Sequence, residues 1–162
     1  GSQKQDARTT ASDGPDLLIV DPVWSDYDPE GKRIRELAAA RLEQQPGAAQ
    51  AVLTEPHLTL LDPHLQTWQA SARSGQLDED SDTLVLERQV QVRREPPSRR
   101  LVLHTEQLRL TNGGNRLETD QAVVLKSGNW QVSGKGFRAD LDKQKLNISG
   151  GVRGVHDQDD SD

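Results

Sequence analysis

Few side chains of this sequence stand at spacings that support catalysis or metal binding. Its four histidines, His57, His64, His104 and His156, form no pair at the spacing of metal ligands within one element. The acidic runs DEDSD and DQDD lack the alternating ligands, central glycine and final glutamate of a calcium loop. No serine lies in a Gly-x-Ser-x-Gly turn, and no glycine loop precedes a Lys-Ser or Lys-Thr pair. The sequence therefore predicts no enzyme, no metal site and no cofactor.

Positive charge concentrates in one run, RREPPSRR, which holds Arg93, Arg94, Arg99 and Arg100. Arginine forks suit phosphate groups, so an anionic ligand or headgroup could dock there. The favoured explanation is a charged hairpin turn that keeps strand ends in water and blocks edge pairing. The whole chain has a formal net charge of -6 and repels polyanions. We therefore expect no nucleic-acid partner.

Composition limits the core that can surround such residues. The chain has 162 residues, enough for one domain with a buried interior, but only 32% are hydrophobic and 3% aromatic. Cysteine is absent, which excludes disulfides and thiolate metal sites. No apolar run approaches the roughly 18 residues of a membrane span. Gly1-Ser2 is typical of a cloning remnant, so we expect an anchor or signal upstream of it.

Alternating apolar residues between turn signals predict an all-β chain. In the stretch 82–110, Leu and Val stand at almost every second position of two runs that a Pro-Pro turn separates. The apolar residues change between odd and even positions from Leu103 to Leu108, and again from Val132 to Phe137. Such a slip in parity predicts a bend or bulge in the strand. The pattern Thr105-x-x-Leu108-x-Leu110 recurs weakly from Thr119. A meandering sandwich, a jelly roll or a short solenoid would fit.

One segment departs from this pattern. In EGKRIRELAAARLEQQ, residues 30–45, Ile34, Leu37, Ala38 and Leu42 fit helical spacing, and Ala, Leu, Glu and Arg favour helices. Local propensity therefore predicts a helix in this segment.

The apolar faces are the most informative feature of the chain. Two sheets packed face to face enclose a layer roughly 10 Å thick. With few aromatic side chains to fill it, that layer could leave a groove for flexible hydrocarbon, while a dry sandwich core is the alternative. We expect a disordered leader over residues 1–16, one folded domain over 17–155 and an acidic disordered tail over 156–162.

The order of several short motifs adds a resemblance. The segments YDPEGKRIRELAAARL, TWQASARSGQL, LERQVQV, LHTEQLRL, LETDQAVVL and SGKGFRADL follow one another as in the LptC family of periplasmic lipopolysaccharide-transport proteins. The resemblance covers about residues 17–155. It implies a twisted antiparallel β jelly roll of two packed sheets, open at the ends, with acyl chains between the sheets and sugars outside. It also implies a strand, rather than a helix, at RIRELAAARLEQQ.

The resemblance further implies a place in a transport route. Such a protein lies in the periplasm, anchored to the inner membrane by an N-terminal helix. It receives lipopolysaccharide from the extractor LptBFG through its N-terminal region and passes it to LptA through its C-terminal edge. Weak self-association is also expected. A soluble LptA-like bridge protein and a carbohydrate-binding jelly roll are the alternatives.

These implications assign roles to particular residues. We expect the groove to be lined by Leu58, Leu60, Trp68, Leu84, Leu86, Leu101, Leu103, Val123, Trp130, Val132, Phe137 and Ile148. We expect partners to dock at Gly31, Gly136, Leu146, Ile148 and Val152. One departure from the family is Arg88, which replaces the glycine of a Leu-x-Gly-x-Val pattern; either a bulge turns it outward or it reaches the groove rim.

Overall fold

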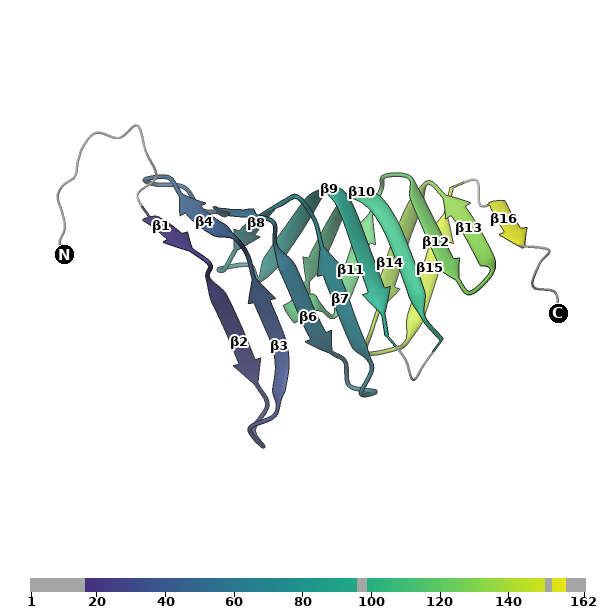
Figure 1. The fold of residues 1–162 in the computed structure, drawn as a ribbon, viewed down its shortest axis with the longest axis horizontal. Helices are drawn as coiled ribbons and strands as arrows, with labels where there is room; N and C mark the ends of the chain where they lie inside the picture. The colour runs from purple at the N-terminus through teal and green to yellow at the C-terminus, as the bar shows by residue number, and fades with distance from the viewer. Residues whose placement is uncertain (1–16, 96–98, 151–152, 157–162) are drawn as a thin grey trace.

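The structure is a computed structural model that describes residues 17–95, 99–150 and 153–156. Within these ranges the chain consists of antiparallel strands and one 3-10 turn, η1 (Asn112–Gly114). The molecule is elongated, with its first strands at one end and its last strands at the other (Figure 1). The predicted all-β antiparallel fold is confirmed.

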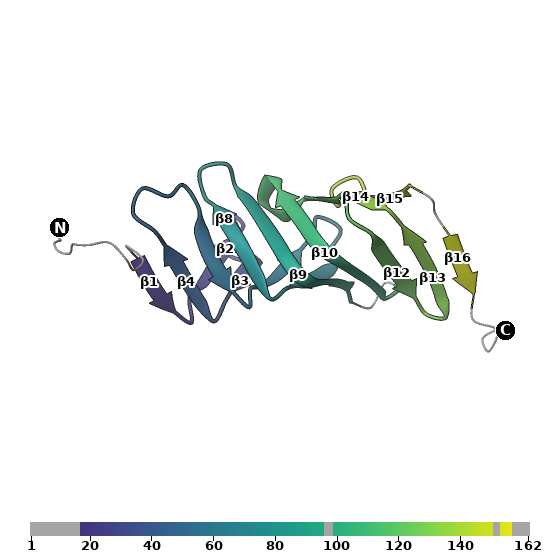
Figure 2. The same ribbon diagram turned by 90° about the horizontal axis from the view of Figure 1, so that it is seen from above.

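The strands form two layers that run along the long axis. Layer A contains, in spatial order, β1 (Leu17–Val20), β4 (Arg41–Gln44), β5 (Ala51–Thr54), β8 (Ser74–Asp78), the first half of β9 (Thr83–Arg94), the second half of β10 (Leu101–Thr111), β11 (Arg116–Thr119), β14 (Gly136–Asp140) and β15 (Lys145–Ser149). Layer B contains β2 (Val23–Tyr27), β3 (Arg33–Ala38), β6 (His57–Leu61), β7 (Thr67–Ser71), the second half of β9, the first half of β10, β12 (Val123–Ser127), β13 (Trp130–Gly134) and β16 (Arg153–His156). Because β9 and β10 belong to both layers, the layers are two arms of one folded sheet (Figure 2).

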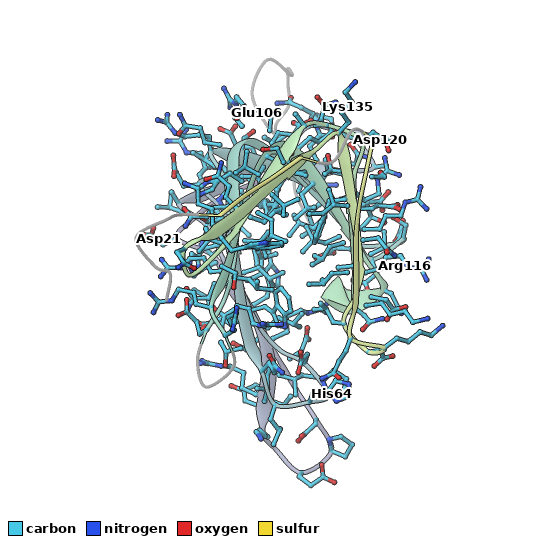
Figure 3. All side chains as sticks on the ribbon, turned by 90° about the vertical axis from the view of Figure 1, so that its right-hand side faces the viewer. Asp21, His64, Glu106, Arg116, Asp120 and Lys135 are labelled. Atoms are coloured by element: carbon cyan, nitrogen blue, oxygen red, sulfur yellow. The ribbon has the colours of Figure 1, made fainter. Side chains whose placement is uncertain are left out.

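A row of corners joins the two layers along one side of the molecule. At each corner the chain leaves one layer and enters the other. Backbone hydrogen bonds connect successive corners: Glu55 N–H donates to Arg73 O, and Arg73 N–H donates to Arg88 O, both at 2.9 Å. Figure 3 shows Glu106 and Lys135 on this corner side and His64 on the opposite side. We call that opposite side, where the hairpin turns lie, the open side.

The central corner explains the place of Arg88. Arg88 and Gln89 oppose the single residue Glu106 where the β9–β10 register shifts, so they form a β-bulge. Both have positive φ, 72° and 52°, and both side chains are exposed. The bulge therefore turns Arg88 outward, away from the inner face that Leu86 and Val90 share.

The parity slips read from the sequence coincide with corners. The slip between Leu103 and Leu108 contains the bulge partner Glu106. The slip between Val132 and Phe137 contains Lys135, where the chain passes from β13 to β14. The Thr105 and Thr119 repeat also marks corners, since Thr105 Oγ1 donates to Ala122 O at 2.9 Å and Thr119 Oγ1 accepts from Gln121 N–H at 3.0 Å.

The helix predicted over residues 30–45 by propensity is wrong, and the strand implied by the family resemblance is confirmed. The segment forms β3 and β4, with a corner at Ala39 and Ala40 between them. Strand β3 pairs with β2 on one side and β6 on the other, and this tertiary pairing outweighs local propensity. The corner also shifts the parity of inward residues between Leu37 and Leu42, which produced a spacing that resembles a helix.

The predicted leader and most of the predicted tail lie outside the described residues. Strand β1 begins at Leu17, the first residue of the predicted domain. The other boundary needs correction by one residue, because His156, assigned to the tail, is the last residue of β16 and pairs with Trp130.

Candidate functional site

The inner faces of the two layers enclose an apolar interior, which is closely packed in the middle of the molecule and hollow in its N-terminal half. In the middle of the molecule the interior is closely packed: Leu53, Leu86 and Leu108 are 0% exposed and Leu103 is 2% exposed. These residues leave no room for a ligand in the structure as it stands. The dry core considered from composition is therefore present in this part of the molecule.

A cavity of about 250 Å³ opens between the layers in the N-terminal half. Its lining consists of Trp24, Asp26, Arg35, Leu37, Leu58, Leu77, Glu79, Asp82, Thr83, Leu84, Leu110 and Gly114. Layer B contributes residues of β2, β3 and β6, and layer A contributes residues of β8, β9, β10 and the turns after β8 and β10. We call this the N-terminal cavity.

Charged side chains gather where the N-terminal cavity meets the open side. Arg35 Nε and Nη2 donate to Asp26 Oδ2 at 2.7 and 2.6 Å, and Arg35 Nη1 lies 3.7 Å from Asp82 Oδ1. Asp26 and Arg35 belong to layer B, whereas Asp82 lies in the hairpin between β8 and β9 of layer A. The guanidinium group therefore links the two layers across the cavity entrance.

All three tryptophans belong to layer B and stand at inward positions of its strands. Trp24 lines the N-terminal cavity, and Trp68 is buried in the core. Trp130 lies opposite buried Ser127 in the register of β12 and β13, and it is 39% exposed near the C-terminal end. The interior therefore has aromatic side chains along its length on one wall.

Trp68 anchors a polar group at the open side. Its indole N–H donates to the buried carboxylate of Asp62 at 2.9 Å, and the guanidinium of Arg94 lies over its ring, 5.8 Å from the centroid. Burial lowers the pKa of Arg94, while the charge of Asp62 acts to raise it. A cation over an indole face is a favourable pairing, so Arg94 extends the hydrophobic wall and keeps its charge near water.

The arginine run forms contacts within its own hairpin. Arg93 and Arg100 pair with Glu95 at 3.3 and 3.7 Å, and Arg94 donates to Arg99 O at 2.7 Å. These contacts agree with the favoured explanation of a charged hairpin turn.

The histidines whose side chains the structure describes, His57, His64 and His104, do not form a site. His57 and His104 lie on layer B strands with exposed side chains, and His64 lies in the turn after β6. Burial, together with the charge of Lys126, lowers the pKa of His104. In the part of the chain that the structure describes, no three His, Asp or Glu side chains gather in a way that would hold a metal ion.

The predicted lining residues divide into three groups. Only Leu58 and Leu84 line the N-terminal cavity. Most of the others belong to the packed interior: Trp68, Leu86, Leu103, Val123, Val132 and Phe137 are buried, and Leu60, Leu101 and Ile148 pack against them in part. Trp130 is exposed. Which of these residues contact a ligand stays a prediction.

Several cavity residues were missed by the sequence reading. Leu37 was hidden by the helix prediction, and Leu77 stands directly before the acidic run DEDSD, outside the alternating runs from which the core was predicted. No apolar pattern pointed to the charged residues Arg35, Asp26 and Asp82. Asp26 does share a face of β2 with Trp24, because the two are two positions apart. Strand parity could have found Trp24 and Leu37 once β2 and β3 were recognised as a hairpin.

The two ends of the molecule differ from its middle. At the N-terminal end, β1 has four apolar residues, Leu17 to Val20, all exposed, and its only partner among the described strands is β4. Val23 and Tyr27 of β2 are exposed beside it. At the C-terminal end, β15 pairs only with β14 among the described strands, and its Leu146 is exposed. Each end therefore presents an unpaired strand edge.

The glycines assigned to partner docking have different surroundings. Gly31 is exposed in the β2–β3 turn with φ of 88°, and no atom lies near the Cβ that another residue would carry. Gly136 is buried, and a Cβ there would lie 2.9 Å from Ser149 Oγ. A larger residue at position 136 would therefore disturb the β14–β15 pair as well as any partner. Val152 lies outside the described residues.

Comparison with known proteins gives a family and a fold. A family described as "Lipopolysaccharide-assembly, LptC-related" matches residues 1–157. No curated protein sequence matches the chain. Among solved structures, the chain is similar to LptH from Pseudomonas aeruginosa, which is described as the LptA-homologous periplasmic component of the lipopolysaccharide transport device. The TM-score is 0.56 at 10% sequence identity, and the likeness covers 83% of this chain and 94% of LptH. At this identity the likeness shows the fold alone. Among the described residues no helix is long and apolar enough to cross a membrane.

Proposed function

The chain belongs to the LptC family of lipopolysaccharide-assembly proteins, and from this we propose that it holds the acyl chains of lipopolysaccharide between its two layers during transport. Proteins of this family are non-enzymatic components of lipopolysaccharide transport in the periplasm. The finer proposal is that this chain receives the lipid from LptBFG and passes it to LptA. Anchorage to the inner membrane by an N-terminal helix is part of that proposal.

The observation that carries the proposal is the N-terminal cavity. It is an apolar space between two layers that opens to one side, with charged residues at its entrance. Each methylene removed from water is worth about 0.8 kcal/mol, so a lipid with several acyl chains needs such shelter in an aqueous compartment. Leucine walls offer burial without directional contacts, which would let the chains slide.

The two strand edges support the proposed direction of transfer. The apolar edge of β1 and β2 would meet the jelly-roll part of the extractor, and the edge of β15 and β16 would be extended by LptA. An open edge binds another chain by adding a strand, so both ends suit partners that continue the sheet. In this proposal the ATPase of the extractor supplies the directionality.

The aromatic residues give the carbohydrate-binding alternative little support. Glycan sites use exposed aromatic faces, whereas Trp24 and Trp68 face the interior between the layers. The exposed aromatics Tyr27 and Trp130 lie on β2 and β13, near opposite ends of the molecule. The soluble-bridge alternative shares the fold of LptH, so the family match is what favours the LptC role.

Photo-crosslinking tests the proposal. A photoreactive residue at Leu58 or Leu84 would lie in the N-terminal cavity, and we expect it to capture rough-type lipopolysaccharide. The matched controls are Thr59 and Val85, the next residues on the same strands, which point away from the interior. We expect no capture there.

Capture at the outward positions with none at the inward ones would contradict the proposal. Circular dichroism of each variant would show that the strands are retained, because a bulky residue at a buried site could disturb packing.

A further inference from the structure

Two polar contacts join the layers across the open side. One is the pair of Arg35 and Asp82 at the entrance of the N-terminal cavity, 3.7 Å apart. The other is a hydrogen bond of 3.0 Å between His64 Nε2 and the main-chain oxygen of Asp142. Each contact connects a residue of layer B to a turn of layer A, and 78 positions separate His64 from Asp142. Figure 3 shows His64 on this open side, away from the corners.

The layer B end of the second contact is held firmly. The carboxylate of Asp62 accepts hydrogen bonds from the N–H groups of His64 and Gln66, at 2.8 and 2.9 Å, and from the Trp68 indole. Leu65, in the same turn, has φ of 64°, which a leucine rarely adopts. The turn is thus fixed in a conformation that aims His64 across the opening.

The layer A end is fixed as well. Asn115 Oδ1 accepts from Asp142 N–H at 2.7 Å, and the Asn115 side-chain amide donates to Asp140 Oδ1 at 3.3 Å. Burial acts to raise the pKa of Asp140, but the hydrogen bonds from Lys143 and Asn115 and the charges of Lys143 and Arg116 together lower it. The carboxylate is therefore ionised at neutral pH and holds this turn in place.

Apolar contact completes the closure between the two polar contacts. Gly114, with φ of 91°, lies under the side chain of Leu60, because a Cβ at Gly114 would be 3.4 Å from Leu60 Cδ2. Gly113 lies beside Arg35 Nη1 in the same way. Turn residues without side chains thus let layer A approach layer B closely at the open side.

The closed form is too small for the proposed ligand. The N-terminal cavity of about 250 Å³ lies below the roughly 300–1,000 Å³ of pockets that take drug-sized molecules, and a lipid with several acyl chains is larger still. The corner side cannot widen freely, since the chain and its hydrogen bonds run across it. Among the described residues, the two polar contacts across the open side come from turns and from Arg35 of β3.

We propose that the Arg35–Asp82 and His64–Asp142 contacts form a clasp that closes the open side, and that lipid enters the interior sideways when this clasp is released. The inference rests on the proposed function and adds the route of entry to it. The corners act as the hinge, and the layers separate at their hairpin turns. End-on entry past β1 and β2 is the competing route.

A cross-link across the open side tests the route. The chain has no cysteine, so His64→Cys with Asp142→Cys provides the only two thiols, which a short bis-maleimide can join. We expect this cross-link to slow uptake of rough-type lipopolysaccharide, followed by tryptophan fluorescence, by about tenfold or more, as expected for a locked gate. The control pair is Glu87→Cys with Gln107→Cys, outward neighbours in layer A whose side chains touch, and its cross-link should leave the rate unchanged.

A second variant weakens the clasp without a cross-link. Arg35→Met keeps an unbranched apolar stem but removes the ion pairs, and we expect uptake to become about threefold faster, a small effect because the pair is partly exposed to solvent. Arg33→Met, on the same strand with its side chain 51% exposed, should leave the rate unchanged.

The outcomes separate the two hypotheses. Equal uptake by the cross-linked protein and by the same double-cysteine variant before cross-linking would overturn the clasp and favour end-on entry, leaving the carrier function intact. Slower uptake by Arg35→Met would also contradict the clasp. If no form takes up lipopolysaccharide, the carrier function fails and the clasp fails with it.

Discussion

At the scale of single residues, the corner positions carry conformational cost. Arg88 adopts φ of 72° at the bulge of β9, a conformation that costs a residue with a Cβ about 1–2 kcal/mol. Its backbone oxygen accepts from Arg73 N–H, and its side chain is exposed. Position 88 therefore shapes the corner through its backbone, and the Arg88 side chain lies outside the interior.

Replacing Arg88 with glycine should stabilise the fold. Glycine adopts a positive φ without strain, but its freedom in the unfolded chain costs roughly 0.5–1 kcal/mol. Because the relief of strain is larger than this cost, we expect the free energy of unfolding to rise by about 0.5–1 kcal/mol. Urea denaturation measures this change. The control is Gln91→Gly on the same strand, where φ is not positive and a loss is expected. A loss at Arg88→Gly as large as that of the control would mean that the bulge is not strained.

At the scale of elements, the last strands depend on glycines where β13, β14 and β15 meet. A Cβ at Gly134 would overlap Ile148 Cγ2 and would lie 3.0 Å from Ser149 O. The corner at Lys135 also donates its N–H to Ser149 O at 2.8 Å. The close approach of β13 and β15 at this corner therefore requires a residue without a side chain.

Gly134→Ala should destabilise this end of the molecule. Overpacking in a tight contact costs about 1–3 kcal/mol, which urea denaturation would detect. Amide exchange should also rise first in β15. Ser133→Ala, one residue earlier and pointing outward, is the matched control and should change stability by less than about 0.5 kcal/mol. Equal stability of the two variants would show that β15 can shift at no cost.

At the scale of the whole molecule, two layers joined at a row of corners make a long interior with two open ends. Layer B contributes the tryptophans and layer A the turns that close the open side. Both ends expose strand edges, and the N-terminal end also exposes a run of apolar residues. An exposed apolar edge is a site for pairing with another chain, either a partner or a second copy.

We expect the isolated protein to self-associate weakly through these ends. Sedimentation velocity at rising protein concentration should show it, and Leu18→Lys with Val20→Lys, which charges the outward face of β1, should abolish it. Thr54→Lys with Gln76→Lys, outward on the neighbouring strands β5 and β8, should leave it unchanged. Equal self-association of both double variants would place the contact elsewhere.

Alternation alone determined much of this protein. It predicted an antiparallel all-β chain, and it located the corners through the parity slips at Glu106 and Lys135. Successive side chains of a strand point to opposite faces, so an extra residue at a corner moves the inward residues from odd to even positions, or the reverse. This change is visible in the sequence. The order of motifs also pointed to the family that the match over residues 1–157 then showed.

Tertiary structure alone decided the rest. The segment around Leu37 forms strands because β3 gains partners on both sides, which no local propensity records. The cavity and its entrance bring together Arg35 and Asp82, and the open side brings His64 to Asp142, through folding of one sheet onto itself. Contacts between residues so far apart along the chain depend on the angle between the layers, and the sequence pattern of a single strand contains no information about that angle.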